Sequence, residues 1–141
     1  MSHENIELYR AAVEDFLAGK RDWGVGLADP EIEWDASQST VPYLSGIYRG
    51  IEAVQQWWRE WFAAWETQQF EYELIDAGNR IVMVLDQRMS GRSSGIEVFL
   101  GQWAQVATFR NGLIVHWKLY RSQSGALEAV GLSEQDAHAG S

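Results

Sequence analysis

The sequence contains no cysteine, so it can form neither disulfide bonds nor thiolate metal sites, and the chain is compatible with a reducing cytosol. Basic residues are also few, because 11 Lys and Arg stand against 20 Asp and Glu, a formal net charge of -9. Proteins that bind nucleic acid gather Lys and Arg into a patch that neutralises phosphates. The composition therefore argues against a nucleic-acid partner.

Long apolar runs and metal-binding clusters are missing as well. No stretch reaches the ~20 apolar residues of a membrane span, and no basic segment leads into an apolar run near residue 1. We therefore expect a cytoplasmic protein without a membrane partner. The three histidines are His3 and His138, near the ends, and His116, which alternates with an apolar row. No His, Asp and Glu cluster has metal-ligand spacing, so we expect no metal and no other cofactor.

Tryptophan, in contrast, is abundant, with eight residues among 141. Such large rings must pack into a core, a pocket or an interface. The chain length predicts one domain, 1–141, with a core at about 5–132 and a flexible tail at 133–141. A helix is expected from Asn5, as its cap, to Gly19. A second helix over 51–65 carries one broad apolar stripe: Val54, Trp57, Trp58, Trp61, Phe62 and Trp65.

The second half of the chain predicts sequential β-strands after a short strand at 31–35. Asn111-Gly112, between alternating apolar and polar residues, indicates a tight hairpin, because both turn residues must take positive φ. The long connection 36–50 is a candidate lid. The four sequential strands are expected at 70–76, 80–90, 95–110 and 113–120.

The hairpin register predicts which side chains share the inner face of the sheet. A bulge is expected at Gly101, where a long strand must bend. The opposite face should carry an apolar row that a second copy covers, which predicts a homodimer. That outer row is Val82, Val84, Val106 and Thr108. The inner row is Trp103, Gln105, Ala107, Phe109, Val115, Trp117 and Leu119, with Gln87 and Met89 beside it.

Helices followed by an antiparallel meander indicate the α+β class. We expect a curved antiparallel sheet that wraps around the helices and forms a cone with an apolar cavity. Three longer runs and the closing segment 126–132 then resemble the SnoaL-like branch of the nuclear-transport-factor-2-like superfamily. The runs are 28–34, 48–54 with its following tryptophans, and 108–115.

This resemblance implies a fold that hosts ketosteroid isomerases, polyketide cyclases, epoxide hydrolases, dehydratases and non-catalytic binding domains. By similarity to ketosteroid isomerases, Asp35 falls at the position of the catalytic base. The two oxyanion-donor positions correspond to Ala12 and Gln105, and Tyr9 lies about one turn from the first. The limonene-type epoxide hydrolases need an Asp-Arg-Asp set, and the matching positions are Leu85, Gln87 and Leu119, so that mechanism is excluded.

The candidate site combines the resemblance with the inner row. Asp35, Gln105 and Arg121 are the candidate catalytic residues, with Arg121 at the mouth of the cone. Apolar surroundings should raise the pKa of Asp35. The candidate ligand contacts are Trp58, Trp61, Gln87, Trp103, Ala107, Phe109, Trp117 and Leu119.

Two hypotheses that involve a small molecule remain open. In the first, the protein is a cofactor-independent enzyme in which Asp35 moves a proton, so that a hydrophobic carbonyl compound is isomerised, cyclised or dehydrated. In the second, the same cavity binds a small hydrophobic or aromatic ligand without chemistry. A purely structural dimer is a third hypothesis. Whether a carbonyl compound is turned over distinguishes the first from the second.

Overall fold

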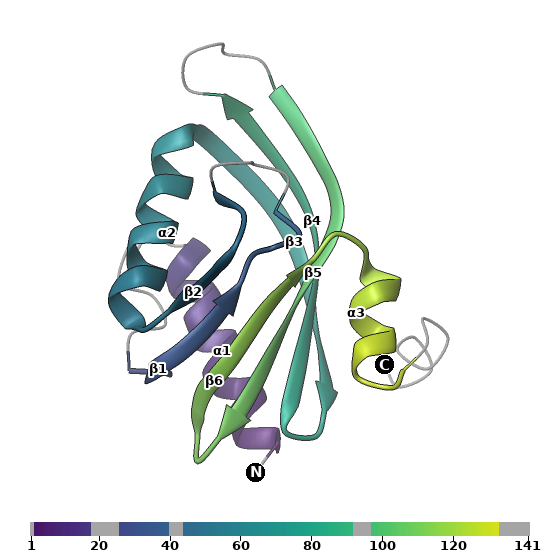
Figure 1. Ribbon diagram of the computed structural model, residues 1–141. Helices are drawn as coiled ribbons and strands as arrows, with labels where there is room; N and C mark the ends of the chain where they lie inside the picture. Colours follow the sequence, from purple (N-terminus) through teal and green to yellow (C-terminus); the bar gives the residue numbers. More distant parts are fainter. Residues whose placement is uncertain (1, 18–25, 40–43, 92–96, 133–141) are drawn as a thin grey trace.

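The computed structural model describes residues 2–17, 26–39, 44–91 and 97–132 (Figure 1). These residues contain three helices and six strands. The helices are α1 (Ser2–Leu17), α2 (Ile51–Ala64) and α3 (Gln123–Ala129). The strands are β1 (Ala28–Asp35), β2 (Ile47–Arg49), β3 (Trp65–Ala77), β4 (Arg80–Gly91), β5 (Glu97–Arg110) and β6 (Leu113–Tyr120).

All six strands belong to one sheet with the order β2-β1-β6-β5-β4-β3. The predicted α+β class is confirmed, and the four sequential strands β3 to β6 pair as an antiparallel meander. The sheet is mixed, because β1 lies parallel to β6, whereas we expected only antiparallel pairs. Because β1 and β6 are far apart in sequence, local patterns do not reveal that they pair.

The Asn111-Gly112 hairpin joins β5 and β6 as predicted, with φ of 52° and 79° at its two residues. Further along, the register changes at Val115, since Phe109 pairs with Ile114 and Thr108 pairs with His116. This bulge turns Ile114 into the core at 3% exposure, and Val115 is only half-buried. The expectation that Val115 belongs to the inner row is therefore wrong.

A second irregularity lies between β4 and β5. Gln87 pairs with Gly101 and Arg88 with Phe99, so the extra residue is Leu100, one position from the predicted bulge. Downstream of it the expected register holds: Trp103, Gln105, Ala107 and Phe109 are all buried. The side chains of Gln87 and Met89 lie outside the described residues.

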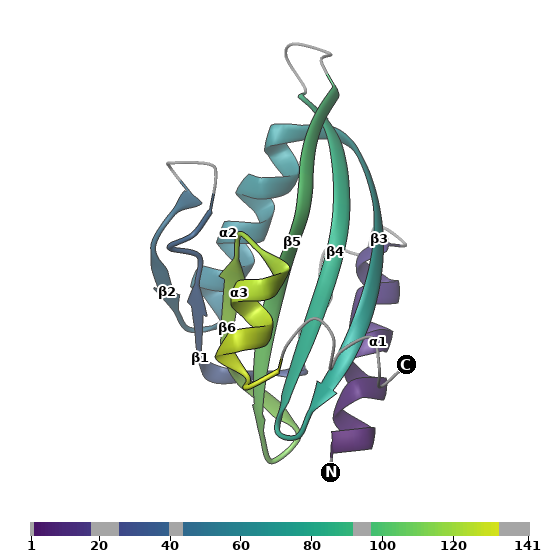
Figure 2. The same ribbon diagram turned by 90° about the vertical axis from the view of Figure 1, so that its right-hand side faces the viewer.

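Helices α1 and α2 lie on one side of the sheet and α3 on the other (Figures 1 and 2). Tryptophans from α2, β1 and β6 pack between the sheet and α2, with ring centroids 4.9 Å apart for Trp34 and Trp117 and 5.2 Å for Trp34 and Trp57. Trp57 also donates a hydrogen bond from Nε1 to the carbonyl of Leu44 at 2.7 Å. The predicted helix over 51–65 is present, although it ends at Ala64.

The predicted start of the first helix is wrong. Helix α1 begins at Ser2, so Asn5 lies inside it and is 7% exposed, facing the core instead of capping the end. The hydrophobic spacing that predicted the helix does hold, because Tyr9 and Val13 are buried one turn apart. Gly19, the expected end, lies outside the described residues.

Helix α3 covers the outer face of the sheet. Val82 and Val106, at 0% and 5% exposure, pack with Leu127 in a second apolar cluster that α3 completes. Ser122 caps this helix by accepting a hydrogen bond from the backbone N–H of Gly125 at 3.0 Å. The outer apolar row, including Val84, therefore does not require a second copy to cover it, and the homodimer remains a prediction without this support.

Leu127→Ala should lower the free energy of unfolding by about 2–5 kcal/mol, because it removes a buried side chain and leaves a cavity over the outer valines. Chemical denaturation measures this change. Glu128→Ala, at an exposed neighbouring position of the same helix, should change it by less than about 0.5 kcal/mol. Similar values for both variants would mean that α3 does not contribute to the folded core.

Candidate functional site

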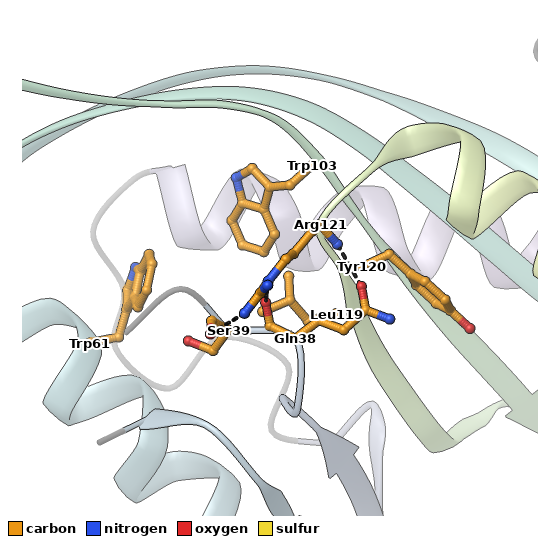
Figure 3. A pocket seen from close by; sticks show the side chains of 7 residues that line it. All are labelled: Gln38, Ser39, Trp61, Trp103, Leu119, Tyr120 and Arg121. Carbon is orange, nitrogen blue, oxygen red and sulfur yellow. Dashed lines mark hydrogen bonds between the residues drawn. The ribbon is translucent and has the colours of Figure 1, made fainter. Parts of the chain in front are cut away.

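A cavity of about 100 Å³ opens near the C-terminal end of β6 (Figure 3). Helix α2 supplies one wall, β5 and β6 supply the opposite wall, and the segment after β1 closes one side. The lining residues are Gln38, Ser39, Trp61, Trp103, Leu119, Tyr120 and Arg121. We refer to this cavity as the mouth pocket.

The walls of the mouth pocket are mainly apolar. The rings of Trp61 and Trp103 have centroids 6.3 Å apart at an interplanar angle of 49°, and Leu119 is 5% exposed. The indole Nε1 of Trp103 is buried and has no hydrogen-bond partner within the described part of the chain. Aromatic walls of this kind suit a flat apolar ligand, whose ring can contact their faces and edges.

Arg121 is the one charged side chain in the lining (Figure 3). Its Nε donates to the backbone carbonyl of Gln38 at 2.7 Å, and its Nη2 donates to that of Ser39 at 3.4 Å. Its backbone N–H donates to Oε1 of Gln38 at 2.9 Å. These contacts fasten the segment after β1 to the end of β6, so they shape the rim of the pocket.

A separate polar network lies inside the core. The indole Nε1 of Trp117 donates to the hydroxyl of Tyr9 at 3.1 Å, and that hydroxyl donates to Oε1 of Gln105 at 3.2 Å. Because an indole N–H can only donate, the Tyr9 proton is available for Gln105. Burial raises the pKa of Tyr9 well above its ordinary value, although the bond from Trp117 acts in the opposite direction. Tyr9 therefore stays protonated.

This network changes the assignment on α1. The alignment with ketosteroid isomerases placed Ala12 opposite the strand position, whereas the structure brings Tyr9 to Gln105. Ala12 is buried in the core at 7% exposure and carries no polar group. About one helical turn separates the two residues, and it is the hydroxyl of Tyr9 that reaches Gln105.

Tyr9→Phe should lower the free energy of unfolding by about 1–3 kcal/mol, because it leaves the Trp117 N–H and the Gln105 carbonyl oxygen buried without this partner. Urea denaturation is the measurement. Tyr48→Phe is the matched control, since the Tyr48 hydroxyl makes only a long bond, 3.4 Å, to the Ser45 carbonyl. A cost as small as that of the control would contradict the network.

Asp35 lies on the other side of the sheet. It pairs with Lys118, and Lys118 pairs with Val106, which belongs to the outer cluster beneath α3. Cross-strand partners share a face, so Asp35 points away from the inner row. Its Oδ2 lies 3.7 Å from Nζ of Lys118. The expectation that Asp35 faces the apolar pocket wall is wrong.

The pKa of Asp35 also differs from the expectation. Burial acts to raise it, but two hydrogen bonds from Ser37, at 2.6 Å and 3.0 Å to Oδ1, and the charges of Lys118 and His116 outweigh burial. The pKa of this carboxyl is therefore lowered. The error arose because the sequence shows the apolar neighbour Trp34 but not the face on which the carboxylate lies.

Asp35→Asn should lower the free energy of unfolding at pH 7 by about 1 kcal/mol, through loss of the charged hydrogen bonds and the ion pair. A carboxyl with a lowered folded-state pKa stabilises the fold above its ordinary pKa, and this contribution disappears as pH falls through the folded-state value. The difference between variant and wild type should therefore vanish in strong acid. NMR titration of the Asp35 carboxyl measures the shift, and a raised pKa would contradict it. For the unfolding free energy the control variant is Glu71→Gln, at an exposed position.

The described candidate residues thus lie in four places. Trp61, Trp103, Leu119 and Arg121 line the mouth pocket. Trp58, Ala107, Phe109 and Trp117 are buried in the core cluster. Gln105 lies in the interior network, Asp35 lies on the outer face, and the Gln87 side chain is outside the described residues.

Sequence reasoning missed three lining residues, Gln38, Ser39 and Tyr120. Gln38 and Ser39 belong to the long connection 36–50, which we expected to cover the cavity, and this was the one feature of the sequence that pointed to them. Within the described ranges, no three His, Asp or Glu side chains gather as a metal site would require. None of the helices described is long and apolar enough to cross a membrane.

Comparison with known proteins identifies the family. The model of the SnoaL-like domain family matches residues 7–117, so the chain belongs to that family and the resemblance seen in the sequence is confirmed. No curated protein matches the chain.

Several solved structures share the fold. One is an NTF2-like protein of unknown function from Burkholderia pseudomallei, 21% identical, with a TM-score of 0.72 over 91% of this chain and 98% of that one. TerC, crystallised with polyporic acid, is 17% identical, with a TM-score of 0.70 over 90% and 98%. A proposed SnoaL-like polyketide cyclase from Mesorhizobium loti is also 17% identical, with a TM-score of 0.63 over 82% and 97%. At these identities the likeness concerns the fold alone.

Proposed function

We propose that this SnoaL-like domain binds a small, flat and mainly apolar molecule in the mouth pocket. The observation that carries the proposal is a cavity whose walls are the rings of Trp61 and Trp103 and the side chain of Leu119. Ligand pockets are concave, largely apolar and equipped with a few polar groups that fix orientation. Arg121 and Ser39 supply such groups here.

The size of the cavity limits what it holds. An apolar cavity of about 150 Å³ accepts one benzene ring, and the mouth pocket offers about 100 Å³. The mouth pocket is smaller than that cavity but open on one side, so it holds part of one ring, or one end of a longer molecule that continues through the opening. TerC, which shares the fold, was crystallised with polyporic acid, and this supports an organic ligand for the cavity of such a domain.

Binding without chemistry is favoured over acid-base catalysis. A general base must come within hydrogen-bond reach of the proton that it removes. The seven lining residues include no carboxylate and no histidine. Asp35, the base that the family resemblance suggested, is bonded to Ser37 and Lys118 on the outer face. Isomerisation or cyclisation would require a proton acceptor, and the described lining offers neither of the usual ones, a carboxylate or an imidazole.

Leu119→Phe tests the pocket by filling it. The larger ring should occupy the cavity and weaken binding of small aromatic compounds by at least about tenfold, since burial of one ring accounts for about 1.5–3 kcal/mol. The free energy of unfolding should change little, because the added volume fills an existing space. NMR titration of the indole N–H signals of Trp61 and Trp103 reports binding directly.

Leu113→Phe is the matched control, because Leu113 begins the same strand and does not line the pocket. It should leave ligand affinity unchanged. Two results would count against the proposal. One is a wild-type protein that binds no small aromatic compound at millimolar concentration, and the other is equal weakening by both variants.

A further inference from the structure

We propose that the mouth pocket selects an anionic ligand, a flat molecule with a carboxylate, phenolate or enolate group that pairs with Arg121. This inference rests on the proposed function, because it concerns the ligand of the same pocket. It adds a charge requirement to the shape requirement, and it names Arg121 as the residue that sets it.

No acid among the described residues balances the charge of Arg121. Its two side-chain hydrogen bonds go to the neutral carbonyls of Gln38 and Ser39. The acidic side chains that do form pairs use other basic residues: Glu33 pairs with Arg49 and His116, and Asp35 pairs with Lys118. Among the described residues, no carboxylate lies within 4.0 Å of the Arg121 guanidinium. Its partner group is therefore left for a ligand to supply.

The guanidinium also has donors to spare. Arginine carries five N–H groups in a planar fork, and the carbonyls of Gln38 and Ser39 use two of them. The others can meet two oxygens of one carboxylate, which is the geometry that the fork matches best. The same two carbonyls hold the guanidinium in place before a ligand arrives, so less side-chain freedom is lost on binding.

The rest of the lining fixes the orientation of such a ligand. Trp61, Trp103 and Leu119 form the apolar part, and Arg121 lies beside them at the rim (Figure 3). An aromatic acid can place its ring against the indoles and its charged group at the guanidinium. A neutral ligand of the same shape would fill the same apolar space but would gain only weaker, uncharged hydrogen bonds from Arg121.

Benzoate and benzamide provide a matched pair of probes, because they share size and planarity and differ in charge. Titration of wild-type protein, followed through the Trp61 and Trp103 indole signals, should show benzoate binding about tenfold tighter than benzamide, the scale of one charged hydrogen bond. Added salt should reduce this preference, since the pocket rim is exposed. Leu119→Phe should abolish binding of both probes at this site.

Arg121→Gln should remove the preference for benzoate, because the charged fork is lost while the apolar lining remains. The ratio of the two affinities is compared within the variant, so that a change in the shape of the rim affects both probes alike. Arg121→Lys keeps the charge and loses the fork, so its preference should be intermediate. Arg110→Gln is the control for net charge, because Arg110 is an exposed arginine at the opposite end of β5.

The outcomes separate the two proposals. Equal affinity for both probes in the wild type, with the indole signals shifting, would overturn the anion requirement and leave the pocket intact. A preference for benzoate that survives in Arg121→Gln would also overturn it. If neither probe shifts the signals of Trp61 and Trp103 at any concentration, both the binding function and the anion requirement fail.

Discussion

The packing of aromatic rings between α2 and the sheet is the constraint on which the rest of the structure depends. Trp34 is fully buried and touches Trp57, Trp58 and Trp117, with centroids between 4.9 and 5.8 Å. These rings fill the space that a curved sheet leaves around its helices, so the middle of the cone is occupied by protein. The mouth pocket lies at one end of this packing, where the ring series reaches Trp61 and Trp103.

Alternation along the strands separates two kinds of chemistry. The inner face of β6 carries Trp117 and Leu119 in the core, and the outer face carries His116 and Lys118, which pair with the acids of β1. Placing a charge at a partly solvated face costs little desolvation free energy, whereas burying it in the interior costs much more. The acids of β1 consequently stabilise the outer surface, while the pocket obtains its charge from Arg121, beyond the end of the strand.

Local patterns predicted much of the fold and less of the site. The Asn111-Gly112 turn fixed the register of β5, and the tryptophan stripe located α2, because both signals depend on residues near one another in sequence. The parallel pairing of β1 with β6 and the cover formed by α3 depend on distant contacts, so no local pattern contained them. The bulge at Val115 shows the same limit, since one extra residue changes which side chains between the turn and Trp117 face inward.

The site shows why a family position does not carry its chemistry with it. Asp35 stands at the expected strand end, yet its pairing with Lys118 and its bonds from Ser37 hold it as a charged group outside the cavity. The oxyanion-donor position on the strand is Gln105, whose carbonyl oxygen accepts a hydrogen bond from Tyr9, and Tyr9 in turn accepts one from Trp117. Asp35, with its lowered pKa, lies on the outer face and Gln105 is a neutral amide, so neither a carboxylate nor a histidine is among the described residues that line the apolar space. What such a space can still do is recognise shape and charge, and these are the properties that the indoles and Arg121 provide.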